Sequence, residues 1–79
     1  MKVWCVMKGA EDDDGETALW EIFASKEAAR NAILADFKVE NGDEGYAFTE
    51  GSPTHYEMGD EHNNFLISWD IEEWEVKGG

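Results

Sequence analysis

The sequence has little cysteine, few basic residues and no long apolar run, and each shortage excludes a class of protein. With a single cysteine, Cys5, the chain cannot form an internal disulfide, which excludes the cross-linked scaffold of many small secreted domains. No apolar run approaches the roughly 18 residues that a membrane-spanning helix requires. No signal peptide precedes the first predicted strand. We therefore expect an intracellular, cytoplasmic protein without a membrane segment.

Basic residues are scarce relative to acids: six Lys and Arg stand against nineteen Asp and Glu, for a net charge of −13. Nucleic-acid phosphates and anionic lipid surfaces would be repelled by such a chain. We therefore expect no direct binding to nucleic acid and none to membranes. Basic protein surfaces and cations remain as partners, although the charge also destabilises the folded state through self-repulsion.

What the chain does contain is enough apolar material for a core. Four Trp, four Phe and two Tyr stand among 42% hydrophobic residues, and each aromatic side chain can bury roughly 150–250 Å². An acidic chain with few apolar residues would be disordered, whereas this composition predicts a folded one. The length of 79 residues predicts a single domain, 1–79.

The first half of the chain predicts two strands and a helix. Residues 2–8 and 17–24 are rich in β-branched and aromatic residues and flank an acidic loop, which is typical of a hairpin. Ser25 is a suitable helix N-cap. Residues 26–37 carry apolar side chains at the i, i+4, i+8 spacing of a buried helical stripe.

The second half predicts strands. Residues 46–49 and 54–58 fit two short strands around a turn, and fit an ordered loop equally well. Residues 65–76 alternate apolar and polar, but the phase changes after Glu72. A β-bulge at Glu72-Glu73 would return the apolar side chains to one face, so we expect a long bulged strand with its acids turned outward. The element order ββαβ(β)β predicts an α+β fold, an antiparallel sheet of four to five strands with one helix packed on one face.

The acids fall in blocks, and Trp74 lies among those of the last strand, where an aromatic side chain suits the centre of an interface. Same-face side chains of a strand are about 6.6–6.8 Å apart, so a carboxylate row here would be spaced comparably to phosphates. Such a row could occupy a basic site that holds nucleic acid. The residues that we expect to contact a basic partner are Glu11, Asp12, Asp13, Asp14, Glu16, Asp60, Glu61, Asp70, Glu72, Glu73, Trp74 and Glu75. The alternative, that the charge serves solubility alone, stays open.

The sequence predicts neither a metal site nor a catalytic one. Residues 12–16 hold carboxylates but lack the alternating spacing and distal Glu of a calcium loop. The His and acid pairs within residues 55–62 occur commonly by chance and favour exposed turns over a zinc site. Cys5 lies in mid-strand without a neighbouring base, as a core thiol does. We therefore expect a protein that is not an enzyme and that uses no cofactor.

The opening MKVW, the run LWEIFASKEAARNAI and the closing IEEWEV together resemble the layout of small phage and bacterial proteins. Short acidic proteins of this class include anti-CRISPR proteins and restriction or repair inhibitors, several of which imitate DNA. The resemblance implies an inhibitor that occupies the basic nucleic-acid channel of a host defence complex, with a type I CRISPR surveillance complex as the first choice of target. It supplies no motif that assigns individual residues.

Two other functions stay open. The ending Lys77-Gly78-Gly79 resembles that of ubiquitin-like modifiers and of small sulfur carriers with the β-grasp fold. That resemblance implies adenylation and thiocarboxylation of the Gly79 carboxylate. The other function is that of a plain acidic domain that binds a host protein through its aromatic residues, without mimicry.

Overall fold

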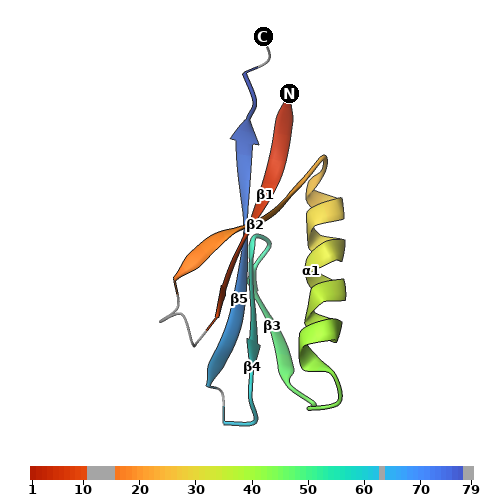
Figure 1. Ribbon diagram of the computed structural model, residues 1–79, viewed down its shortest axis with the longest axis vertical. Coiled ribbons are helices and arrows are strands. Elements are labelled where there is room, and N and C mark those ends of the chain that lie inside the picture. The colour runs from red at the N-terminus through yellow and green to blue at the C-terminus, as the bar shows by residue number, and fades with distance from the viewer. Residues whose placement is uncertain (11–15, 63, 78–79) are drawn as a thin grey trace.

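The fold is a five-stranded antiparallel sheet with one helix on one face (Figure 1). The computed structural model describes residues 1–10, 16–62 and 64–77. The α+β class and the order ββαβββ confirm the prediction. Residues 46–58, which fit either two strands or an ordered loop, form two strands. In chain order the elements are β1 (Lys2–Ala10), β2 (Thr17–Phe23), α1 (Lys26–Asn41), β3 (Ala47–Ser52), β4 (His55–Gly59) and β5 (Phe65–Glu75).

The strands lie in the order β2-β1-β5-β4-β3, so the first and last strands pair at the centre of the sheet. β1 and β5 are antiparallel and stay in register from Lys2 opposite Glu75 to Ala10 opposite Ile67. Hairpins on either side, β1–β2 and β3–β4, complete the sheet. The ends of β1 and β5 project together beyond the first turn of α1 (Figure 1).

The predicted bulge at Glu72-Glu73 is wrong. The β1–β5 register continues through these residues without a shift, and the irregularity in β5 lies at its other end, where Phe65 and Ile67 pair with Gly59 and Met58. The prediction of a bulge assumes that every apolar side chain of the strand reaches one core. This end of β5 projects beyond the core, so Trp74 stays 47% exposed and no bulge is required.

α1 begins and ends where its sequence allows. The Ser25 side chain accepts a hydrogen bond from the Ala28 N–H at 3.0 Å and caps the first turn. The helix runs past the predicted end at residue 37 because nothing interrupts it before Gly42. Gly42 has φ of 54°, a value that glycine adopts with little strain, and its N–H closes the helix on the Lys38 carbonyl.

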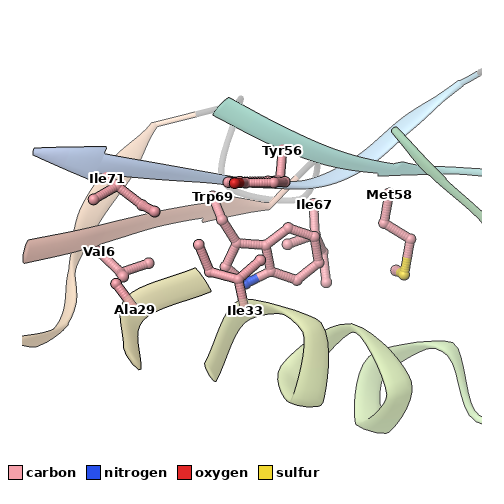
Figure 2. Close-up of a cluster of buried hydrophobic side chains, with 8 residues drawn as sticks. All are labelled: Val6, Ala29, Ile33, Tyr56, Met58, Ile67, Trp69 and Ile71. Atoms are coloured by element: carbon pink, nitrogen blue, oxygen red, sulfur yellow. The ribbon is translucent and has the colours of Figure 1, made fainter. Parts of the chain in front are cut away.

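The core lies between α1 and the sheet (Figure 2). Trp69 is the largest buried side chain and lies on the central strand, with its ring over Ile33 of α1 (Figure 2). The Trp69 indole N–H donates to Asp36 Oδ2 of α1 at 2.9 Å, which satisfies a polar group that would otherwise be stranded in the core. The buried cluster comprises Val6, Ala29, Ile33, Tyr56, Met58, Ile67, Trp69 and Ile71.

The single helix among the described residues, α1, is too short and too polar to cross a membrane.

Candidate protein-binding surface

The face of the sheet opposite α1, which we call the open face, is the candidate binding surface. Directly opposed residues of antiparallel strands share a face, and successive residues alternate between faces. Val6 and Ile71 are opposed and belong to the core beneath α1, so their neighbours Cys5 and Glu72 belong to the open face. Within the described residues, α1 is the only helix and it covers the other side (Figure 1).

One half of the open face is apolar. Leu19, Ile22 and Trp74 are exposed by 47%, 51% and 47%, although side chains of this size are commonly buried. Val3 is opposite Trp74 and therefore lies on the same face. Cys5 is fully buried in the same half, between Ile22 and Glu72, as expected of a structural thiol.

The other half of the open face is acidic. Asp70 and Glu72 of β5 project from it, with Glu57 of the neighbouring β4. His55 lies between two of these acids: its Nδ1 is 2.6 Å from Asp70 Oδ1 and its Nε2 is 3.1 Å from Glu57 Oε1. Trp74 joins the two halves, because its indole N–H donates to Glu72 Oε2 at 3.2 Å.

The acids around His55 change its protonation. The hydrogen bond to Asp70, followed by that to Glu57, raises the pKa of His55 above its ordinary value of 6.5, although partial burial opposes the shift. The imidazole therefore carries a positive charge over a wider pH range than a solvated histidine. A charged His55 offsets part of the negative charge of this half of the face.

The lysines and the arginine lie on the helix side of the sheet, on α1 or outside the strands. Lys8 contacts Asp36 Oδ2 at 2.7 Å beneath α1, Lys2 contacts Glu73 at 3.3 Å, and Arg30 of α1 contacts Glu50 at 3.7 Å. Lys26 and Lys38 also belong to α1, and Lys77 follows β5 outside the strands. Among the described strand residues of the open face, none is Lys or Arg, so its fixed charges are all negative.

The acids that we predicted as one row of β5 are divided between two faces. Asp70 and Glu72 share the open face with Trp74, whereas Glu73 and Glu75 lie on the helix side. There Glu73 pairs with Lys2 and Glu75 with the amino terminus at 3.1 Å. The single row of four carboxylates is therefore wrong, because a regular strand alternates its side chains.

The remaining predicted acids lie away from this surface. Asp60 and Glu61 occupy the turn between β4 and β5, at the end of the sheet farthest from Glu75 (Figure 1). The Asp60 carboxylate accepts hydrogen bonds from Asn64 and from the His62 N–H. These hydrogen bonds lower the pKa of Asp60. Glu16 is exposed just before β2. The predicted contact residues Glu11, Asp12, Asp13 and Asp14 lie outside the described residues, as do Gly78 and Gly79.

Sequence reasoning missed His55 and Glu57 as members of the site. Their i, i+2 spacing indicated a shared face of one strand, but their proximity to Asp70 depends on the β4–β5 register. No group of three or more His, Cys, Asp or Glu within residues 1–10, 16–62 and 64–77 is arranged to hold a metal ion. The two ring nitrogens of His55 are directed to different carboxylates, so these groups do not converge on one point.

No protein-family model matches the chain, and neither curated proteins nor solved structures yield a significant match. The fold itself bears on the β-grasp resemblance. A β-grasp sheet pairs its first and last strands in parallel, whereas β1 and β5 are antiparallel here. Sheet hydrogen bonding also continues to the Val76 N–H, which donates to the Met1 carbonyl at 2.7 Å. The antiparallel pairing departs from that resemblance, and Gly78 and Gly79 lie outside the described residues.

Proposed function

We propose that this protein is an acidic inhibitor that uses its open face to bind the basic nucleic-acid-binding surface of a host defence complex. The observation that supports the proposal is the separation of charge: the open face carries Glu57, Asp70 and Glu72, and its described strand residues include no Lys or Arg. Protonated His55 offsets part of this charge, and the remaining negative charge attracts a surface of opposite sign.

The geometry also suits competition with nucleic acid. Asp70 and Glu72 are same-face neighbours on one strand, about 6.6–6.8 Å apart in such geometry, which is comparable to the spacing of phosphates. Each carboxylate could replace a phosphate in its contact with Lys or Arg. Trp74 beside Glu72 would supply the apolar contact that anchors such an interface. Occupation of the basic channel then excludes the nucleic acid.

The target that we would test first is a type I CRISPR surveillance complex in the cytoplasm of a host bacterium. The assay measures how much the protein, added to purified RNA-loaded complex, reduces binding of labelled target DNA. We expect inhibition that follows the protein concentration. A complex that binds DNA equally well in its presence contradicts this choice of target.

A pair of charge-matched variants tests the surface itself. The triple variant Glu57→Gln, Asp70→Asn, Glu72→Gln neutralises the open face. The control Glu21→Gln, Asp43→Asn, Glu44→Gln removes the same formal charge from exposed acids elsewhere. We expect the first variant to weaken inhibition at least tenfold and the control less than threefold. Equal losses would show that net charge alone matters and would overturn the proposed site.

A second function, binding of a host protein without mimicry, is favoured by the exposed apolar half of the same face. Leu19 and Ile22 lie outside the acidic half, so the double variant Leu19→Ser, Ile22→Thr separates the two functions. If binding fails in this variant and survives in the open-face charge variant, the apolar half is the interface. The reverse result supports the mimic.

A further inference from the structure

The far end of β5 has a backbone edge without a partner strand. β4 pairs with β5 only as far as His55 opposite Asp70, and the Thr54 carbonyl then accepts a hydrogen bond from the Ile71 N–H at 2.8 Å. β5 continues beyond this point to Glu75 with β1 on its other side. No strand of the described chain pairs with the segment Glu72–Glu75 on the β4 side.

The alternation of backbone groups shows which ones point to this edge. The Ile71 N–H points toward Thr54, on the β4 side, and the Val76 N–H points toward Met1, on the β1 side. Backbone groups of successive strand residues point to opposite sides, so Glu73 and Glu75 share the direction of Ile71. Their N–H and C=O groups face outward, as donors and acceptors for an added strand.

A hollow of about 300 Å³ lies beside the same edge. Trp4 and Ile71 contribute apolar surface to its lining, and Lys26, Thr54 and Glu73 contribute polar groups. It lies on the helix side of the sheet, since Trp4 and Glu73 are opposed there. Every second side chain of a strand added to β5 would be directed to this side, and one of them could enter the hollow.

The two outer edges of the sheet are less suited to an added strand. β2 pairs with β1 across a register shift that leaves Trp20 without an opposed residue, and β3 pairs with β4 across a shift at Gly51. Such bulges bend a strand and disrupt the regular row of backbone groups. The β1–β5 register has no shift, so the outward groups of β5 keep regular spacing.

Charge selects the chemistry of the strand that fits. Glu72 lies on the open face at this edge, whereas Glu73 and Glu75 lie on the helix side, where they pair with Lys2 and the amino terminus. A second copy of the chain, pairing edge to edge, would bring the same carboxylates together, and opposed like charges destabilise a strand pair. A strand with basic side chains would meet complementary charge instead, and its Lys or Arg could also contact the face of the Trp74 indole.

We propose that the Glu72–Glu75 edge of β5 binds an extended peptide of alternating basic and apolar residues by antiparallel strand addition. The apolar side chains lie on the helix side, where one enters the hollow beside Trp4. The basic side chains lie on the open face, beside Glu72 and Trp74. Backbone hydrogen bonds hold the peptide, and the hollow selects among side chains. This site goes beyond the proposed function, because the open face could act without it.

Backbone methylation separates strand addition from simple charge attraction. The probe is the acetylated and amidated peptide (Lys-Val)4, titrated into the full chain by calorimetry. In antiparallel addition the valine N–H groups face β5, since residues with side chains on one face share the direction of their backbone groups. We expect N-methylation of the valines to weaken binding at least tenfold and N-methylation of the lysines to change it less than threefold. Equal affinities of the two methylated peptides, which carry equal charge, would overturn the proposal.

Two variants of the protein test the same edge, with the peptide left unchanged. Glu73→Pro removes the outward N–H, and proline is tolerated where a strand's N–H faces away from its partner. Glu73→Gln is its control, because it also removes the charge but keeps the N–H. We expect Glu73→Pro to bind the peptide at least tenfold more weakly than Glu73→Gln does. Amide exchange supplies a second readout that does not depend on the variants: the Glu73 and Glu75 N–H groups should exchange at least tenfold more slowly with peptide bound.

Self-association is the competing use of this edge. Sedimentation at increasing protein concentration should show a monomer throughout. A dimer that the peptide dissociates would assign the edge to a second copy and overturn the proposal. Failure of the peptide experiments would leave the open face untouched, and the Glu57, Asp70 and Glu72 variants test that face separately.

Discussion

Asp36 and Trp69 join the helix to the sheet through one hydrogen bond, from the indole N–H to Asp36 Oδ2 at 2.9 Å. The same oxygen lies 2.7 Å from Lys8 Nζ, so one carboxylate serves an aromatic donor of β5 and a cation of β1. Asp36 is thus an acid that contributes to folding. It also shows that the acidic residues of this chain do not all serve one purpose.

Removing that acceptor should destabilise the fold. Asp36→Ala leaves the Trp69 indole N–H without a partner in the core and releases Lys8, and an unsatisfied buried donor costs about 1–3 kcal/mol. Asp36→Asn keeps a neutral acceptor, so it should lower the free energy of unfolding by less than Asp36→Ala does. Urea unfolding measures both. Asp43→Ala, at an exposed position, is the control and should stay within about 0.5 kcal/mol of the unaltered protein.

The His55 cluster should make stability depend on pH. Its hydrogen bonds to Asp70 and Glu57 raise the pKa of His55 in the folded state above 6.5, so protonation favours folding. This contribution is fully present below the unfolded-state pKa of about 6.5 and is lost as the pH rises through the higher folded-state pKa. The stability of the unaltered protein relative to His55→Gln should therefore be greater at pH 5.5 than at pH 8.5. Thermal unfolding at both values tests this, and an equal difference at the two pH values contradicts it.

Salt should slow the association of the protein with its basic target. Raising the ionic strength from about 0.01 M to 0.15 M shortens the screening length from about 30 Å to 8 Å, so the attraction that guides the encounter weakens. We expect the association rate with the surveillance complex to fall at least tenfold, with a smaller change in the dissociation rate. Surface plasmon resonance measures both rates. A rate that is constant across this range would contradict an electrostatic interface.

Trp74 should matter for binding and little for folding. It is 47% exposed on the projecting end of β5, so its truncation leaves no cavity in the core. Interface tryptophans commonly contribute about 2 kcal/mol or more, which corresponds to a loss of affinity above tenfold for Trp74→Ala. Val39→Ala removes another exposed apolar side chain, on α1, and should leave affinity unchanged. Equal effects of the two changes would exclude Trp74 as an anchor.

Local patterns predicted most of the fold. The Ser25 cap and the Ala29–Ile33 stripe are properties of adjacent turns, so the helix could be placed from sequence alone. The division of the β5 acids between two faces could not be predicted from sequence. In a strand taken to be buried along its whole length, the phase of Trp74 and Val76 indicates a bulge. Only the packing shows that this end projects beyond the core and keeps regular alternation.

The candidate surface was less accessible to sequence reasoning. Asp70 and Glu72 were selected because acids are dense near Trp74, and they do share a face with it. The contribution of His55 and Glu57 depends on which strand lies beside β5 and in what register, which is long-range information. The same holds for the absence of Lys and Arg from the described open face, since each strand alone shows only the alternation of its own residues.

The central position of β5 also determines when the fold can form. β1–β2 and β3–β4 are hairpins of neighbouring segments, but only β5 connects them, because it lies between β1 and β4. During synthesis β5 is the last of the five strands to leave the ribosome, so until then the two hairpins share no sheet. Pairing residues as distant as Lys2 and Glu75 requires a large loop to close. We therefore expect cooperative folding to begin only after Glu75 has emerged.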